Sequence, residues 1–296
     1  AVRNKGFEAI LGVDIISNKD LVWTVDANIG LNRNKVTELY GERDAVTGEV
    51  APIILGDGIG IAGSANRILR EGADADTWYI PEWAGVNPQT GAPQWYRTVK
   101  NENGEEVREI TEKYAQANQV EMGAYTPKFF GGFSTTLTYK QFDANMVFGY
   151  SVGGKIYNYT RAEYDSDGAY SDRNQMRLMP SWKRWEKPGD IATHPVASYN
   201  NPSLSNKVSS RYLEDGTYLK MRTLSLGYNF ALPQMNLENV RVFLTGENLF
   251  TITDYSGVDP EIPSYDDGSG VSRVVGVTTT VYPSTRKFLL GFNLTF

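Results

Sequence analysis

Side chains that commonly carry out acid–base or metal chemistry are scarce in this sequence of 296 residues. It contains a single histidine, His194, and no cysteine. A serine-type hydrolase needs its histidine beside a hydroxyl and a carboxylate in a rigid arrangement, and nothing around Ile191–Pro195 predicts one. Zinc sites are built mainly from cysteine and histidine ligands, of which His194 is the sole example here. The sequence therefore predicts no catalytic residue, no metal site and no cofactor.

Two short acidic stretches suggest calcium, because hard cations prefer closely spaced carboxylates. The first is Asp165-Ser166-Asp167-Gly168, with Asp172 beyond it. The EF-hand spacing fails here, since Gly168 comes too early and the twelfth position counted from Asp165 is Met176 instead of glutamate. We expect a solvated turn, and likewise at Tyr265-Asp266-Asp267-Gly268, because acidic stretches that end in glycine are common in turns.

Aromatic side chains in the long polar stretches are stronger candidates for a binding role. Rings of this kind stack on sugars or hold a peptide with little loss of side-chain entropy. The alternatives are packing within the loops or contact with a partner protein. The basic residues Lys183, Arg184 and Lys187 favour a solvated surface, or contact with an acidic partner. The candidate substrate-binding residues are Trp78, Tyr79, Trp182, Trp185 and Tyr199.

The composition favours strands over helices as the elements that position these side chains. The chain has 29 Gly, 18 Tyr, 12 Phe and 6 Trp, and aromatic residues suit a pleated surface while glycine suits turns. No apolar run reaches the roughly 20 residues that a membrane-spanning helix needs. The net charge of −6 provides no basic surface for a phosphate backbone, so we expect no nucleic-acid partner. The predicted fold class is all-β.

Apolar and polar residues alternate along several segments, as they do in strands with one apolar and one polar face. The clearest is Leu21–Asn34, which pairs with the segment from Phe7 to Ile15 through a tight polar connection at 17–20. Further strands are predicted at 133–139, 144–152, 219–230, 240–250 and 288–296, and a weaker pair at 78–84 and 94–99. These segments make about nine strands.

Connection lengths separate two architectures that share this alternation. In a soluble β-sandwich the apolar faces form a core, whereas in a membrane β-barrel they face lipid. Short links at 17–20, 140–141 and 231–239 alternate with long ones at about 35–77, 100–128, 157–211 and 253–284. A compact sandwich rarely carries several loops longer than about 15 residues, whereas outer-membrane barrels have short periplasmic turns and long outer loops. We therefore expect a barrel, with a soluble or surface carbohydrate-binding sandwich as the alternative.

The alternation also assigns the two faces of the predicted sheet. Aromatic residues on the apolar face are expected at lipid or in the headgroup belt: Trp23, Tyr150, Tyr228 and Phe296. Residues of the opposite parity are expected to face the lumen, where they contact a plug or a passing solute: Asp26, Asn28, Asn145, Ser225, Asn229 and Thr245.

Nine strands cannot close a barrel by themselves, because bacterial single-chain barrels have even strand numbers and leave no edge in lipid. Residues 1–10 contain neither a signal peptide nor its cleavage site. We expect the missing strands to come from residues N-terminal to Ala1, on the same chain or as a separate piece.

Ordered motifs carry a family resemblance over most of the chain. The first are Arg3–Glu8, Asn32–Val36 and a segment resembling G-x-D-P-x-T-G-x-P at Trp83–Pro93, with Asn87 where aspartate is usual. Pro127-Lys128, Gly131-Gly132-Phe133 and Tyr139-Lys140 follow. The most specific motifs are Tyr218–Arg222, Leu226-Gly227-Tyr228, Arg241-Val242-Phe243, Gly246–Phe250 and Gly257–Glu261. Phe292–Phe296 is similar to the assembly signal of outer-membrane barrels.

In this order, the motifs resemble the C-terminal part of the SusC/RagA-type TonB-dependent transporters of Bacteroidetes. The resemblance implies that residues 1–296 supply about nine C-terminal strands of a 22-stranded, plugged transmembrane barrel in the outer membrane. It also implies import of oligosaccharides or peptides, a SusD-like lipoprotein lid, force from TonB and contact with outer-membrane lipid. The plug and the remaining N-terminal barrel segment would be partners of this chain. An outer-membrane enzyme and the sandwich are the rival interpretations, and the resemblance argues against both.

Overall fold

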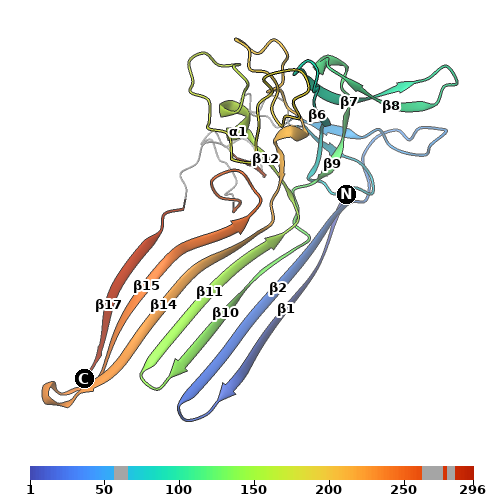
Figure 1. The fold of residues 1–296 in the computed structure, drawn as a ribbon. Helices are drawn as coiled ribbons and strands as arrows, with labels where there is room; N and C mark the ends of the chain where they lie inside the picture. The colour runs from blue at the N-terminus through green and yellow to red at the C-terminus, as the bar shows by residue number, and fades with distance from the viewer. Residues whose placement is uncertain (57–65, 262–275, 279–283) are drawn as a thin grey trace.

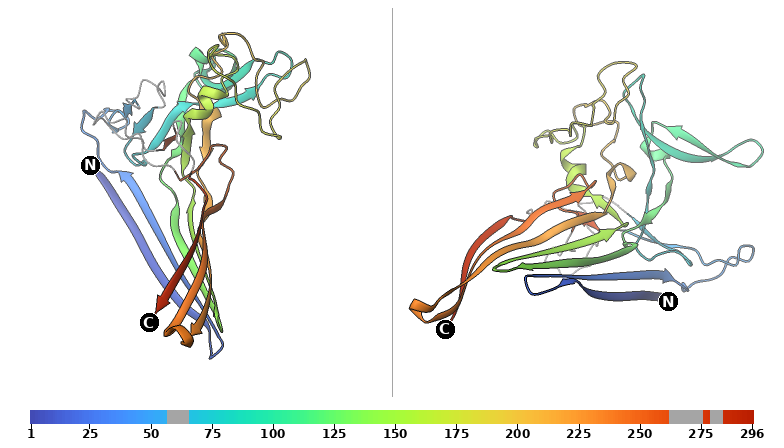
Figure 2. Two further views of the ribbon diagram at one scale, coloured as in Figure 1. Left: turned by 90° about the vertical axis from the view of Figure 1, so that its left-hand side faces the viewer. Right: turned by 60° about the horizontal axis from the view of Figure 1, so that its bottom comes forward.

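Seven long strands form one antiparallel sheet in the computed structural model, which describes residues 1–56, 66–261, 276–278 and 284–296 (Figure 1). Their order is β1-β2-β10-β11-β14-β15-β17. The sheet is curved (Figure 2). The bounds are β1 (Val2–Ser17), β2 (Leu21–Val36), β10 (Phe129–Tyr139), β11 (Phe142–Val152), β14 (Tyr218–Leu232), β15 (Leu237–Thr253) and β17 (Lys287–Thr295).

All tight connections lie at one end of this sheet and all long ones at the other. The tight ones follow β1, β10 and β14, the last through a 3-10 turn at Pro233–Met235 whose Asn236 has a left-handed backbone. The long ones are residues 37–128, 153–217 and 254–286, and we refer to their described parts together as the cap. The expected alternation of short and long connections is confirmed.

The strand register aligns apolar side chains across the whole sheet. One row crosses all seven strands and contains only apolar residues, which are Ile16, Trp23, Leu137, Ala144, Leu226, Leu244 and Leu290. Cross-strand aromatic pairs lie on this same face, with ring centroids 4.6 Å apart for Phe133 and Phe148 and 4.7 Å for Phe142 and Tyr228. Such pairs stabilise sheets beyond the area they bury. Trp23, Tyr150 and Tyr228 share this face, as the alternation predicts.

The neighbouring row, on the opposite face, is polar on six of its seven strands. It consists of Asp14, Thr24, Thr136, Asn145, Ser225, Thr245 and Leu289. Side-chain hydrogen bonds connect the strands here, from Asn145 Nδ2 to Thr136 Oγ1 at 2.8 Å and between Thr245 and Ser225 at 3.1 Å. Asp26, Asn28 and Asn229 lie on this face too, so the predicted separation of the two faces is confirmed.

The weaker predicted pair at 78–84 and 94–99 is not part of the long sheet. These residues contribute to β5 (Thr77–Pro81), β6 (Trp83–Val86) and β7 (Pro93–Lys100), which are short strands in the cap. The long sheet therefore contains seven of the nine expected strands. Alternation identified the pair as β structure, but a strand's alternation does not specify the sheet that it joins.

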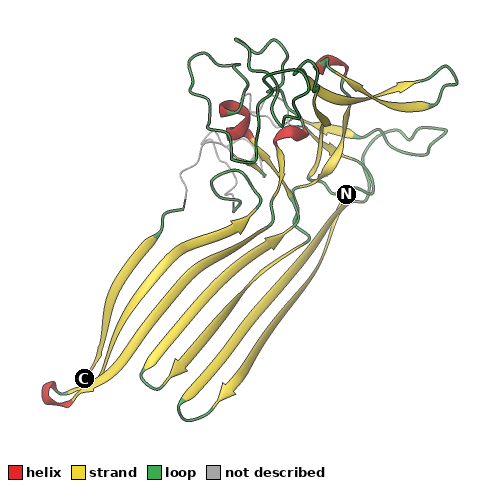
Figure 3. Ribbon diagram, in the orientation of Figure 1, coloured by secondary structure: helices red, strands yellow, loops and turns green. Residues whose placement is uncertain are grey.

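Three small sheets and a short helix build the cap (Figure 3). The sheet orders are β3-β4-β5-β9, β6-β7-β8 and β13-β12-β16. In the last of these, β12 and β16 belong to different long connections and run parallel. The remaining bounds are β3 (Ile53–Leu55), β4 (Arg67–Leu69), β8 (Glu106–Thr111), β9 (Gln119–Ala124), β12 (Lys155–Asn158), α1 (Tyr159–Tyr164), β13 (Leu213–Asp215) and β16 (Val277–Thr278), with 3-10 turns at Tyr114–Gln116 and Ser210–Tyr212.

One hydrophobic core joins the three long connections. Trp78 and Ile80 come from the first, Tyr157, Ala162, Val208 and Tyr212 from the second, and Val277 from the third. Trp78 is fully buried, and its indole nitrogen donates a hydrogen bond to the carbonyl of Lys155 at 2.9 Å. The expected loops are thus packed together as one folded unit.

The apolar face of the long sheet stays open. Leu226, Leu244 and Leu290 on it are 48%, 49% and 67% exposed. In a β-sandwich a second sheet would cover this face. The other sheets of the described structure lie in the cap instead. Among the described residues, no helix has the length and apolar character needed to cross a membrane.

Candidate functional site

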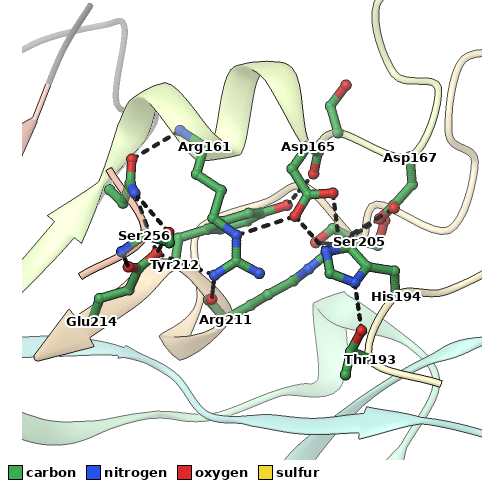
Figure 4. Close-up of polar contacts among 12 residues, drawn as sticks. Arg161, Asp165, Asp167, Thr193, His194, Ser205, Arg211, Tyr212, Glu214 and Ser256 are labelled. Carbon is green, nitrogen blue, oxygen red and sulfur yellow. Dashed lines mark hydrogen bonds and ion pairs between the residues drawn. The ribbon is translucent and has the colours of Figure 1, made fainter. Parts of the chain in front are cut away.

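A buried cluster of charged side chains lies within the cap (Figure 4). Asp165 and Asp167 follow α1, and each is at most 1% exposed. Asn158 directly precedes the helix as its N-cap, and its side chain accepts a hydrogen bond from the backbone N–H of Arg161 at 3.0 Å. The chain then turns back on itself through Asp167 and Gly168, both with positive φ. The local geometry therefore points both carboxylates into the cap interior.

Arginine side chains neutralise these two carboxylates. Arg211, with a side chain 2% exposed, contacts Asp165 at 3.4 Å and forms two hydrogen bonds to Asp167. Arg184 binds Asp167 at 2.6 Å, and Arg161 binds Asp165 at 3.2 Å. A buried charge is tolerated only when it is paired and hydrogen-bonded, and this cluster meets that condition.

The predicted solvated turn at Asp165-Ser166-Asp167-Gly168 is therefore wrong. The reason lies in residues distant in sequence, since the arginines that balance the carboxylates come from α1, from residue 184 and from the turn at Ser210–Tyr212. No group of three or more metal-ligating side chains that could hold an ion occurs in the described parts of the chain. The second acidic stretch, Tyr265-Asp266-Asp267-Gly268, lies outside the described residues.

His194 belongs to this cluster and is fully buried. Its Nε2 is 2.8 Å from Asp165 Oδ2, and its Nδ1 is 2.8 Å from Thr193 Oγ1. The Thr193 hydroxyl, the His194 imidazole and the Asp165 carboxylate together have the composition of a hydrolytic triad. However, the Thr193 hydroxyl is also hydrogen-bonded to both backbone groups of Lys183, at 2.9 and 3.2 Å. The hydroxyl thus holds two chain segments together, and the histidine is enclosed by its neighbours.

The environment sets the ionisation of the cluster. Burial alone would raise the pKa of Asp165, but the hydrogen bond with His194 and the charges of Arg211 and Arg161 outweigh it and leave that pKa below its usual value. Burial also raises the pKa of Tyr212, whose hydroxyl donates to the carbonyl of Asp165 at 3.0 Å. At neutral pH Asp165 is therefore ionised and the phenol of Tyr212 is neutral.

The five aromatic candidates occupy different environments in the cap. Trp78 is in the core, where no ligand can reach its ring. Tyr79 is half-buried beside it on β5. Trp182 is half-buried between the guanidinium of Arg161, 4.2 Å from the ring centre, and the ring of His194 at 5.0 Å. These contacts assign Trp182 a packing role over the buried cluster.

Trp185 and Tyr199 lie further from the core. Trp185 donates from its indole nitrogen to the carbonyl of Pro88 at 2.9 Å and packs on Gly91, where an added Cβ would approach its ring to 2.4 Å. Glycine at position 91 therefore leaves the space that the Trp185 ring occupies. Tyr199 is 77% exposed and offers an accessible aromatic surface.

The basic residues nearby are divided between surface and interior. Lys183 and Lys187 are exposed, and Lys183 pairs with Asp190 at 2.9 Å. Arg184, in contrast, is drawn into the cluster by Asp167, so the expected solvated surface is wrong for this residue. The three arginines could not be assigned from sequence, because isolated basic residues in loops carry no signal of their eventual partners.

Comparisons with known proteins show which proteins this chain resembles. No family model matches the chain. The TonB-dependent receptor P3 of Formosa agariphila is 31% identical over 304 residues, which cover 100% of this chain and 29% of that protein. The TonB-dependent receptor SusC of Bacteroides thetaiotaomicron is 23% identical, with 100% of this chain and 26% of SusC covered. The chain thus spans less than a third of the length of these relatives, and neither is named as an enzyme, in agreement with the sequence.

Solved structures share the fold. The structure of the RagAB peptide transporter matches with a TM-score of 0.74 and 23% identity, covering 100% of this chain and 29% of that one. Its importer in the open-open state gives a TM-score of 0.70 at 22% identity. The long sheet is accordingly the same kind of sheet as in a TonB-dependent transporter barrel. Over its whole length the chain is therefore similar to TonB-dependent receptors, SusC among them, and it shares the fold of the RagAB transporter.

Proposed function

We propose that this chain forms part of the barrel wall of a nutrient importer in the bacterial outer membrane. The observation that carries the proposal is the pair of adjacent rows across the long sheet, one apolar on all seven strands and the other polar on six. A wall between lipid and a water-filled or plugged lumen requires this division, because every lipid-facing side chain must be apolar while the lumen face contacts polar groups.

Strand length is also suitable for a membrane. The strands contain between 9 and 17 residues, whereas a tilted strand crosses the hydrocarbon core with about 9–11. The longer strands can therefore extend past the lipid and carry the cap above it. Trp23, Tyr150 and Tyr228 on the apolar face would lie at lipid or the headgroups, where amphipathic rings are favoured.

The rest of the importer would come from outside this chain. An open sheet cannot remain in lipid, since its edge strands would expose unpaired backbone groups. We infer that an N-terminal segment supplies the other strands and the plug, and that TonB provides force through that segment. The cap would face the outside and contact a SusD-like lipoprotein lid.

The imported solute would be an oligosaccharide or a peptide. Structures of the same fold are described as a peptide transporter, whereas aromatic residues in the cap are compatible with either class. Among the five aromatic candidates Tyr199 has the most accessible ring, and we propose it as the first to contact the solute or the lid. Tyr79, Trp182 and Trp185 would contribute only through their exposed edges.

Fractionation and affinity purification test the proposal. The protein, expressed at its natural length in its own host, is located by membrane fractionation, extracted with detergent and analysed by mass spectrometry. Recovery from the outer membrane with a SusD-like lipoprotein supports the importer. Recovery as a monomer that needs no detergent and brings no partner contradicts it and favours a soluble sugar-binding protein.

A further inference from the structure

Three of the motif segments, Tyr218–Arg222, Gly246–Phe250 and Gly257–Glu261, lie together around one buried lysine, Lys220. Lys220 lies near the cap end of β14 and is only 3% exposed. Its ammonium group is 2.8 Å from Asp259 Oδ2 and 3.2 Å from Glu261 Oε2. Both carboxylates belong to the start of the last long connection. Lys220 therefore pairs with Asp259 and Glu261, and its position on a strand does not predict these partners.

The end of the same connection reaches Lys220 as well. Ser284, just before β17, lies 3.4 Å from the ammonium group and donates a hydrogen bond to Asp259 at 2.7 Å. Burial alone would raise the pKa of Asp259, but the hydrogen bonds from Lys220 and Ser284 lower it below its usual value. Lys220 therefore joins both ends of the connection 254–286 through an ionised carboxylate.

Irregular pairing between β14 and β15 completes the arrangement. The register shifts so that Arg222 opposes two residues, Asn248 and Leu249, of which Asn248 has a φ of 53°. Asn248 donates a side-chain hydrogen bond to the carbonyl of Thr285 at 3.2 Å. Bulges of this kind redirect side chains and are common at barrel rims. Here the bulge adds another contact to the end of the connection.

The register places this contact region on the polar face. Lys220 pairs with Gly149, which lies between Phe148 and Tyr150 of the apolar face and therefore has the opposite parity. Arg222 lies over the same glycine, because an added Cβ at Gly149 would be 2.6 Å from its Nε. Arg222 then binds Glu261 at 2.5 Å. The first part of the connection must consequently reach the polar side of the sheet.

We propose that Lys220 is a positioning residue that fastens both ends of the last long connection to the polar face, so that Tyr255–Glu261 forms a fixed ledge on the wall of the solute passage. The ledge borders a pocket of about 240 Å³ whose lining includes Thr251, Val258 and Arg286. Val258 is 65% exposed and is the ledge side chain that a passing solute would meet. The location in a passage rests on the proposed function, whereas the fastening by Lys220 does not.

Spin labels test the fastening. The natural chain segment has no cysteine, so Val258→Cys and Arg286→Cys each give a single labelling site within it, one at each end of the connection. In the full-length protein in detergent, Lys220→Gln should increase label mobility at both sites, and Lys220→Arg should restore the immobile spectrum. Lys287→Gln is the matched control, since Lys287 is 61% exposed and lies 3.7 Å from Glu247. Unchanged spectra in the correctly assembled Lys220→Gln protein would overturn the proposal.

Reagent size tests the location. In intact cells, a small membrane-impermeant maleimide should label Val258→Cys, and a maleimide on a long polyethylene glycol chain should not. Lys220→Gln should abolish this size discrimination, and Lys287→Gln should preserve it. Equal labelling by both reagents in the presence of Lys220 would show that the ledge is outside the passage and would contradict that part. Detergent spectra remain interpretable if fractionation rejects the importer, so the two failures can be distinguished.

Discussion

The Asp165 carboxylate is buried in the cap, and the free-energy cost of its burial depends on the groups that pair with it. Arg211 and Arg161 supply positive charge, and His194 supplies a hydrogen bond. Removing one partner of a buried pair leaves the others unpaired, which costs more than the net contribution of the pair itself. The cluster is therefore most sensitive to substitutions that keep the shape of a residue and delete its charge.

Asp165→Asn should destabilise the cap by about 3–5 kcal/mol, because it removes one of the negative charges that balance the buried Arg211 and Arg161. Asp172→Asn is the matched control, since Asp172 is exposed in the same connection and should change stability by less than about 0.5 kcal/mol. Hydrogen exchange of residues 158–165 and 208–214 measures the effect. Equal exchange in the two variants would contradict a stabilising role for the cluster.

The lowered pKa of Asp165 also predicts how the cap responds to acid. Stability from a carboxylate with a depressed folded-state pKa is complete above its unfolded value, near 3.9, and is lost as pH falls through the folded value. Cap order should thus persist on acidification to about pH 4 and decline below it. Hydrogen exchange around residues 158–165 across this range gives the profile. Loss of order already between pH 6 and about pH 5 would be inconsistent with this assignment.

The cluster could not be predicted from sequence, because its members come from separate parts of one long connection. Asp165-Ser166-Asp167-Gly168 has the composition of a solvent-exposed turn, and its burial is decided by Arg184 and Arg211, which are distant in sequence. His194 gave no signal of its partner either. Tyr199 is exposed, and its contact with a solute or a partner stays a prediction.

The strands of the long sheet were far more predictable than the cap. A period of two fixes which residues share a face, and the register confirms this from Trp23 on β2 to Leu290 on β17. Alternation cannot say which sheet a short strand enters, and the pair around Trp83 and Trp95 illustrates this limit. There β6 and β7 form a hairpin within the cap, with the two indole rings 5.5 Å apart.

Leu244 and Thr245 allow the two faces to be compared at adjacent positions of β15. Leu244→Arg should reduce stability in the membrane by about 2–4 kcal/mol, because it places a charge on the lipid face, and should lower the amount of assembled protein. Thr245→Arg places the same charge on the polar face beside Ser225 and should be tolerated. Heat-modifiable migration on gels after outer-membrane isolation measures assembly. Equal loss in both variants would argue against a lipid-facing row.

At the scale of the whole molecule, one folded cap covers the end of a long sheet. Its core contains residues of all three long connections, and β12 pairs with β16 across two of them. Connections that share a core are expected to open together, because local unfolding follows cooperative units of packing. Loop lengths in the sequence predicted where the cap would lie, but they could not predict that the connections would share a core.

Trp78→Ala should loosen the three connections together. The substitution removes a fully buried indole and its hydrogen bond to Lys155, at an expected cost of about 3–5 kcal/mol. Hydrogen exchange should therefore accelerate at β5, at β12 and α1, and at β16. Trp185→Ala is the control: its half-buried ring contacts Pro88 and Gly91, so faster exchange should stay within residues 87–92 and 182–196. If Trp78→Ala accelerated exchange in β5 alone, the connections would be independent loops, and a solute or lid bound to one could not alter the others through the core.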